Sequence, residues 1–208
     1  MVGPLGKATE IESFGHVVLV GGGVGTAVIY PQAGALKAKG NRVTAVMGGR
    51  SKEFVILEDE LKAICDAVYP CTDDGSYGYK GFVTGKLAEL IADATHPVNA
   101  VITAGPVPMM KNVAGVTRDK GILTIASLNP IMVDGTGMCG GCRVTVGGKN
   151  LFACVDGPEF NAHEVDFASL VDRLTAYRDH ERGIWEKLKA NPEHQCKLQA
   201  AMAEVGAK

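Results

Sequence analysis

The fold is decided by residues 16–27, which read His16-Val-Val-Leu-Val-Gly-Gly-Gly-Val-Gly-Thr-Ala27. A short apolar run, rich in β-branched residues and ending in glycine, is typical of a buried parallel strand. We expect a helix to follow from about Thr26 to Lys39, where Gly40 and Asn41 stop it. Residues 42–47 read as a second strand. These segments together predict a βαβ unit.

The alternation of helix and strand continues to residue 127. The expected elements are a helix at 53–67, a strand at 68–72, a helix at 83–94, a strand at 100–104, a helix at 107–119 and a strand at 122–127. Five strands with helices between them predict an α/β fold built on a five-stranded, doubly wound, mostly parallel sheet. Ligands are then expected at the carboxyl ends of the strands.

Length and charge exclude several classes of protein. The chain has 208 residues and a net charge of -2, and 6% of its residues are aromatic. Because the basic residues are dispersed, there is no stripe of the kind that nucleic-acid binding needs. The N-terminus lacks the pattern of a signal peptide, and no apolar run is long enough to span a bilayer. We therefore expect a cytoplasmic protein without nucleic-acid or membrane partners.

The glycine-rich turn lies between a predicted strand and a predicted helix, which is the context that gives such a motif meaning. Glycines at 21, 23 and 25 let the backbone turn tightly and approach a pyrophosphate, whose charge meets free N–H groups and the helix N-terminus. Thr26 occupies the third glycine position of the dinucleotide fingerprint, so the pattern departs from the standard form. A tight turn without a ligand is the alternative.

Cofactor choice stays open at the end of the second strand. The acidic residue that would bind a ribose 2′-hydroxyl is absent there, and the chain has Gly48-Gly49-Arg50-Ser51 instead. Arg50 is equally consistent with holding a 2′-phosphate, with contacting the adenine ring, and with lying in solvent. The sequence therefore predicts NAD(P)(H) without choosing between the two forms.

Two further loops follow strands and are expected at the same edge of the sheet. Residues 72–78 contain Asp73, Gly75 and Ser76, a turn composition that we interpret as a contact with a nucleotide ribose or nicotinamide. The alternatives for this loop are acid-base chemistry by the paired carboxylates and a purely local turn. Gly105 and Pro106 begin a helix at the same edge and are predicted to line the nucleotide site.

Beyond residue 130 the chain becomes rich in glycine and cysteine. Asp134, Cys139, Cys142 and Cys154 reproduce the spacing C-x4-C-x2-C…C of plant-type ferredoxins, except that the first ligand is an aspartate. Glycines between these residues free the backbone to fold around iron and to offer N–H groups to sulfur. Residues 143–154 read as a β-hairpin. The pattern predicts an iron-sulfur cluster and hence electron transfer.

Zinc is the principal rival for this site, because three cysteines and one carboxylate also make four ligands. Structural zinc usually pairs two short knuckles, whereas a tight loop with one distant ligand is the ferredoxin arrangement. The remaining cysteines, Cys65, Cys71 and Cys196, are interpreted as free thiols without a ligand role. A nucleotide-binding module with a structural zinc site is the alternative function.

Five motifs together resemble the small (alpha) subunit of NADH-dependent ferredoxin:NADP oxidoreductase, also called sulfide dehydrogenase. They cover residues 21–27 (GGGVGTA), 72–78 (TDDGSYG), 105–110 (GPVPMM), 127–142 (SLNPIMVDGTGMCGGC) and 154–160 (CVDGPEF). The chain is also similar to the electron-transfer subunit of dihydroorotate dehydrogenase, in which cysteine normally takes the first ligand position. Asp134 favours the first family.

The resemblance implies roles for the residues. NAD(P)H passes a hydride to FAD, and single electrons then pass through a 2Fe-2S cluster to a large glutamate-synthase-like flavoprotein subunit or, as a further acceptor, ferredoxin. The implied pyrophosphate site is Gly21, Gly23, Gly25 and Thr26. Asp73, Gly75 and Ser76 are implied near the nicotinamide riboside, and the iron ligands are Asp134, Cys139, Cys142 and Cys154. The implied role is electron relay, and no catalytic side chain is assigned.

The resemblance also implies an NAD(P)-binding, ferredoxin-reductase-like domain at 1–128 and a 2Fe-2S module at 129–163. The charged, helix-prone composition of the remainder predicts a helical tail at 164–208. Relatives carry an FAD-binding β-barrel before the nucleotide domain, and this sequence lacks it. We therefore expect a fragment or truncated product that binds FAD only together with the barrel and is inactive alone.

Overall fold

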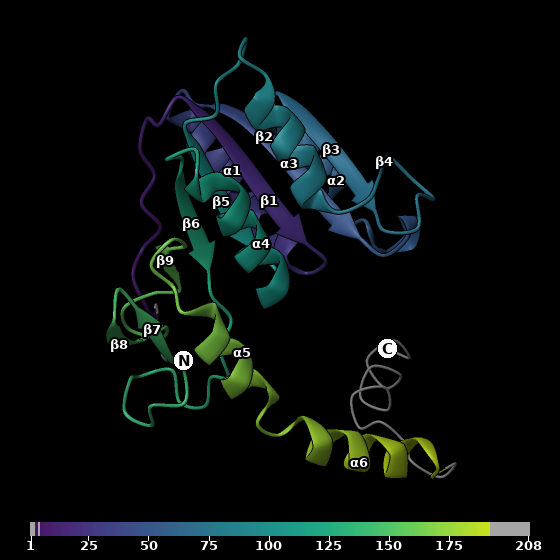
Figure 1. Ribbon diagram of the computed structural model, residues 1–208, viewed down its shortest axis with the longest axis vertical. Helices are drawn as coiled ribbons and strands as arrows, with labels where there is room; N and C mark the ends of the chain where they lie inside the picture. The colour runs from purple at the N-terminus through teal and green to yellow at the C-terminus, as the bar shows by residue number, and fades with distance from the viewer. Residues whose placement is uncertain (1–2, 4, 192–208) are drawn as a thin grey trace, which may run out of the picture. The chain divides into compact units, whose positions relative to one another are not determined.

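The computed structural model describes residue 3 and residues 5–191, so Cys196 and the end of the predicted tail lie outside the described residues. A seven-stranded sheet has the order β4-β3-β2-β1-β5-β6-β9, in which only β9 is antiparallel (Figure 1). The strands are β1 His16–Gly22, β2 Arg42–Gly49, β3 Ala67–Thr72, β4 Tyr79–Lys80, β5 Ala100–Ala104, β6 Leu123–Ser127 and β9 Glu159–Asn161. This confirms the predicted mostly parallel α/β fold.

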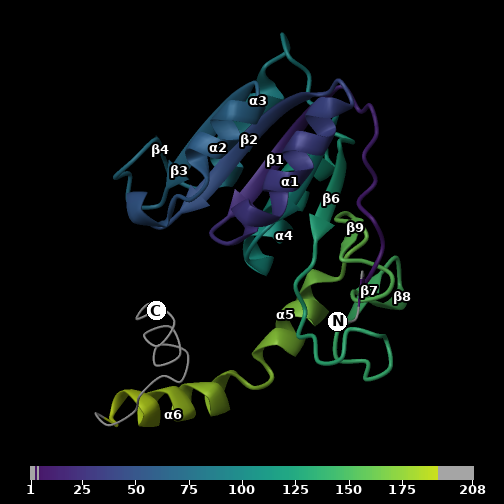
Figure 2. The ribbon, with the colours of Figure 1, turned by 180° about the vertical axis from the view of Figure 1, so that it is seen from behind.

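Helices cover both faces of the sheet, and the alternating side chains of β1 explain why. Val17 and Leu19 face one apolar cluster and Val18 and Val20 face the other, all of them fully buried. The helices are α1 Gly25–Ala38, α2 Glu58–Ile64, α3 Val83–Ala92 and α4 Val107–Arg118. Side chains of α1 and α2 join the first cluster, and those of α3 and α4 join the second. Figure 1 looks onto α3 and α4, and Figure 2 shows α1 and α2 from behind.

One helix and the edges of the sheet differ from the expected pattern. The helix expected at 53–67 is divided into a 3-10 turn at Lys52–Phe54 and α2, because Leu57 has a left-handed backbone with φ of 59°. A residue in the left-handed region of backbone conformation cannot continue a right-handed helix. Strands β4 and β9 extend the five expected strands at the two edges.

The cysteine-rich segment forms a loop and a hairpin between β6 and β9. Strands β7 Arg143–Val146 and β8 Lys149–Phe152 pair in antiparallel fashion, as the sequence predicts. The two ends of this segment lie side by side, because the N–H of Leu128 donates to the carbonyl of Pro158 at 2.9 Å. The tail contains α5 Phe167–Thr175, with Phe167 and Leu170 buried, and α6 Arg178–Lys189, which has no buried residue.

Asn41 secures the segment that enters β1. Its side chain is buried, and Oδ1 accepts the N–H groups of Phe14 at 2.7 Å and Gly15 at 3.0 Å. Nδ2 donates to the carbonyls of Glu12 at 2.7 Å and Leu36 at 2.9 Å. One side chain thus joins the end of α1 to the strand that leads to the glycine-rich turn.

Among the helices of residues 5–191, none has both the length and the apolar character needed to cross a bilayer.

Candidate functional site

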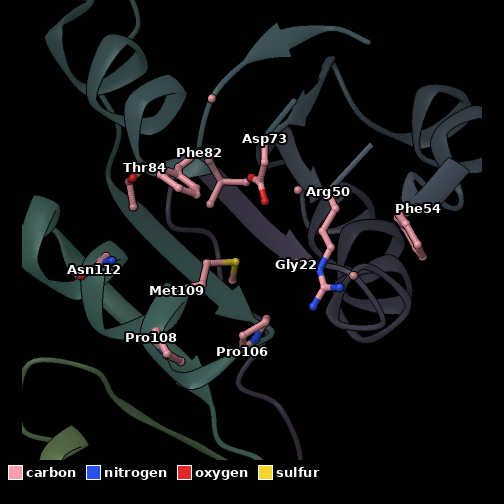
Figure 3. Close-up of a pocket in the computed structure, with 15 residues that line it drawn as sticks. Gly22, Arg50, Phe54, Asp73, Phe82, Thr84, Pro106, Pro108, Met109 and Asn112 are labelled. Atoms are coloured by element: carbon pink, nitrogen blue, oxygen red, sulfur yellow. The ribbon is translucent and has the colours of Figure 1, made fainter. Parts of the chain in front are cut away.

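A cavity of about 580 Å³ opens at the carboxyl ends of the central strands, where a parallel sheet is expected to bind ligands. Its walls come from the ends of β1 and β2, the loops after β2 and β3, the start of α3 with the two residues before it, and the first two turns of α4 (Figure 3). The lining residues are Gly22, Gly23, Gly48, Gly49, Arg50, Phe54, Asp73, Gly81, Phe82, Val83, Thr84, Pro106, Pro108, Met109 and Asn112. This volume falls within the usual range for small-molecule sites.

The glycine-rich turn is built for close approach of backbones. A Cβ atom on Gly25 would collide with the carbonyl oxygen of Ala104, so α1 can begin against β5 only with glycine there. Gly23 has φ of 53° and open space around its missing Cβ, and its N–H donates to the carbonyl of Gly48 at 2.9 Å. The open side of this turn can receive a phosphate at the start of the 14-residue helix α1.

Ten residues were predicted to bind the nucleotide, and the structure places them at different depths. Gly23, Arg50, Asp73 and Pro106 line the cavity. Gly21, Gly25, Thr26 and Gly105 belong to the turns beside it without lining it, and Gly75 and Ser76 lie in the loop after β3. That loop is held by its own bonds, since Ser76 N–H donates to Asp74 Oδ1 at 2.9 Å and Tyr77 N–H donates to Thr72 Oγ1 at 3.1 Å.

Six lining residues are not indicated by the sequence: Phe54, Gly81, Phe82, Val83, Thr84 and Asn112. Phe54 and Phe82 are 50% and 71% exposed, and Asn112 stands on the second turn of α4. From sequence alone, aromatic residues are usually interpreted as part of the hydrophobic core. The available signal was position, because Phe54 follows β2 and Phe82 precedes α3 at the same edge of the sheet.

The predicted iron ligands lie in the loop and hairpin after β6. Cys142 precedes β7 and Cys154 follows β8, so the hairpin brings the two thiols together with their Sγ atoms 3.2 Å apart. Both side chains are buried, and the N–H of Cys154 also donates to Sγ of Cys142 at 3.4 Å. The hydrogen bond with Cys142, followed by burial, raises the pKa of the Cys154 thiol.

Asp134 and Cys139 form a second pair in the exposed loop. The Asp134 carboxylate accepts the N–H of Thr136 and the N–H of Cys139, each at 2.9 Å. The bond from Thr136 contributes most to lowering the pKa of Asp134. Sγ of Cys139 accepts the N–H of Gly141 at 3.4 Å. The loop thus offers an ionised carboxylate, an exposed thiol and backbone donors to sulfur.

This donor set fits a two-iron cluster, in which each iron takes two protein ligands. One pair is Cys142 with Cys154 and the other is Asp134 with Cys139, joined through the backbone of a glycine-rich loop. At Gly137, φ is 87° and a Cβ would lie 2.7 Å from Cγ2 of Val155, so the loop conformation requires glycine. Among the residues that the structure describes, no three His, Cys, Asp or Glu side chains lie close enough together to hold a metal ion as they stand.

Comparison with known protein families finds one match in the cysteine-rich segment. Residues 129–166 match the iron-sulfur cluster binding domain of dihydroorotate dehydrogenase B. The match contains all four predicted iron ligands.

Comparison with whole proteins extends the similarity to the nucleotide domain. The chain is 50% identical over 187 residues to a dihydroorotate dehydrogenase B (NAD(+)) electron transfer subunit homolog from Thermotoga maritima, an alignment that covers 90% of this chain and 65% of that protein. It is 35% identical over 166 residues to a probable electron transfer subunit of the same enzyme from Methanocaldococcus jannaschii, covering 79% and 62%.

A solved structure of NADH-dependent reduced ferredoxin-NADP oxidoreductase, determined to study flavin-based electron bifurcation, superposes with a TM-score of 0.80. The identity is 49%, and the superposition covers 89% of this chain and 66% of that one. The chain thus spans somewhat less than two thirds of the length of these relatives.

Proposed function

The chain is a close homologue of the electron-transfer subunits of dihydroorotate dehydrogenase B and of NADH-dependent ferredoxin-NADP oxidoreductase, and from that premise we propose its place in an electron path. In this proposal electrons pass between NAD(P)H, FAD and a 2Fe-2S cluster, and leave for a partner flavoprotein subunit. The observation that carries the proposal is the pairing of Cys142 and Cys154 across the hairpin, 3.2 Å apart, inside the segment that matches an iron-sulfur domain.

The cluster site is proposed to be held by Asp134, Cys139, Cys142 and Cys154. A bound 2Fe-2S cluster supplies one-electron chemistry. The residues of the chain supply a hard oxygen donor at one position, thiolates at three, and backbone N–H groups that bond to sulfur and tune the potential. The exposed side of the loop, at Cys139, is where an electron acceptor can approach.

The nucleotide site is proposed to be the cavity beside the glycine-rich turn. Its backbone turn and the start of α1 can meet a pyrophosphate, and its guanidinium at Arg50 adds positive charge. We propose that FAD is bound by the part of the relatives that this chain does not span. The partner is proposed to be a large, glutamate-synthase-like flavoprotein subunit, with ferredoxin as a further acceptor.

The test of the cluster is visible absorption with iron, sulfide and zinc analysis of anaerobically purified protein. We expect a coloured protein with iron and acid-labile sulfide in equal amounts. Cys142→Ser should lose the colour, whereas Cys65→Ser, which changes a cysteine outside the loop, should keep it. A colourless, zinc-loaded protein would instead establish the structural zinc module. Flavin that copurifies in stoichiometric amount would contradict the assignment of FAD to another part of the protein.

A further inference from the structure

A second cavity, of about 250 Å³, lies where the segment before β1 runs along the β6 and β9 edge of the sheet (Figures 1 and 2). It shares no lining residue with the nucleotide cavity. Leu123 and Ile125 of β6 make part of its wall apolar, and Glu159 of β9 places a half-buried carboxyl group there. An ionised carboxylate in such surroundings needs donors for both of its oxygens.

Donors reach only one of the two oxygens. Thr9 Oγ1 donates to Glu159 Oε1 at 2.9 Å, and Gln32 Nε2 donates to the same atom. No donor among the described residues bonds to Glu159 Oε2. The side chain of Gln32 is 7% exposed, and within the described part of the chain its Oε1 has no hydrogen-bond partner. Two acceptor oxygens are thus left over on two groups that one hydrogen bond already joins.

A single proton satisfies both groups. In a protonated carboxyl, Glu159 Oε1 still accepts from Gln32 Nε2, while the O–H at Oε2 donates to Gln32 Oε1. Turning the amide of Gln32 end for end does not remove the need for this proton, because its oxygen would then face Glu159 Oε1, and two acceptors bond only through a proton. With an ionised carboxylate the buried amide oxygen has no donor, which disfavours that form.

We propose that Glu159 binds a proton and in that form makes a paired acid–amide contact with Gln32, a latch that holds the N-terminal segment, α1 and β9 together. The latch opens when the proton leaves. Its position gives it meaning, since α1 begins at the glycine-rich turn and β9 is the strand that follows the cysteine-rich segment. The latch therefore joins the helix beside the nucleotide cavity to the strand that leaves the predicted cluster site, which goes beyond the proposed electron path.

The charges around the carboxyl set the direction of the switch. In the cavity wall the N-terminal segment contributes Lys7 and Glu10, whereas β6 and β9 contribute only uncharged neighbours, and α1 presents the neutral Gln32. Burial raises the pKa of Glu159, the bond from Thr9 lowers it, and the charge of Glu10 raises it. Because the pKa in the folded protein lies above that of the unfolded chain, the latch is closed at low pH and is lost as pH rises through the folded-state pKa.

The test combines an NMR titration of the glutamate side-chain carboxyls in the full chain with hydrogen–deuterium exchange over the same pH range, corrected for the intrinsic exchange rate. Glu159→Gln assigns the Glu159 signal, which we expect to titrate above the ordinary glutamate value of about 4.3. Amides of residues 9–14 and 159–161 should lose about tenfold in protection at that midpoint, because a buried acceptor loses its donor.

Two variants isolate the latch. In Glu159→Gln the protection should stay constant, because a side-chain amide donates to Gln32 Oε1 as the protonated carboxyl does. Gln32→Met keeps the length of the side chain without its amide and should abolish the step in protection. The matched control Glu164→Gln changes an exposed glutamate that follows β9 and should behave as the wild type.

Three outcomes would overturn the proposal. A Glu159 signal that titrates at about 4.3 would show an ordinary ionised carboxylate. A raised midpoint with the same exchange in the wild type and Glu159→Gln at every pH would show that the proton holds nothing. A step in protection that persists in Gln32→Met would remove the amide from the switch. Circular dichroism checks folding, and if Glu159→Gln does not fold, the wild type and Gln32→Met decide.

Discussion

Replacement of Asn41 by alanine tests whether one side chain holds the entrance to the central strand. Asn41 makes four hydrogen bonds, two as an acceptor from Phe14 and Gly15 and two as a donor to Glu12 and Leu36. A typical net contribution is about 1 kcal/mol per bond, and a buried group left without a partner costs about 1–3 kcal/mol. The carbonyl of Leu36 keeps other donors, Lys39 and the backbone of Asn41, so its loss is partial.

We therefore expect Asn41→Ala to lower the free energy of unfolding by about 3–5 kcal/mol and Tm by about 10 °C. Asn41→Asp should also destabilise the protein, because an oxygen then faces the two carbonyls that Nδ2 bonds. Urea and thermal unfolding followed by circular dichroism measure both effects. Asn150→Ala is the control, since Asn150 is exposed and, within the described part of the chain, its side chain accepts a single hydrogen bond, from Thr145 Oγ1 at 3.2 Å. An Asn41→Ala protein within about 1 kcal/mol of the wild type would refute the reasoning.

Three further predictions concern titratable groups. Asp134→Cys should keep the cluster and raise its reduction potential, because a hard carboxylate oxygen favours ferric iron more than a thiolate does; an unchanged potential in protein-film voltammetry would mean that Asp134 is not a ligand. Burial raises the pKa of Glu159, so its contribution to stability is present below about pH 4 and lost as pH rises through the folded-state pKa. The free energy of unfolding of Glu159→Gln should rise relative to that of the wild type between about pH 4 and pH 7. If urea unfolding gives the same difference between the two proteins at every pH, the prediction is wrong. In metal-free protein, iodoacetamide should label the exposed Cys139 before Cys65 and Cys71, because burial raises the pKa of the Cys65 and Cys71 thiols to about 11. Peptide mass spectrometry at successive times measures the order of labelling.

The parts of the fold that the sequence predicted are those with strong local patterns. The apolar run at β1, the glycine turn after it and the cysteine hairpin each carry their signal within a few residues. Strands β4 and β9 have two and three residues, too few for any period to be visible. They exist because β3 and β6 offer open edges, which is a property of the folded sheet.

The candidate sites divide in the same way. Spacing predicted the cysteine loop, and position after strands predicted the glycine turn and the loop of Asp73. Phe54 and Phe82 are far apart in the sequence. They line the same cavity because the sheet brings the end of β2 and the start of α3 to one edge. The break at Leu57 likewise depends on a left-handed residue that helical periodicity does not reveal.

The hydrogen bond between Leu128 and Pro158 has a consequence for protein engineering. Since both ends of the cysteine-rich segment meet there, a chain in which a short glycine turn replaces residues 129–157 could still bring β9 alongside β6. Closing a shorter loop costs less chain entropy than closing the natural one. Such a shortened protein is expected to keep the cavity beside the glycine-rich turn and to lose all four predicted iron ligands, so that the two sites can be studied separately.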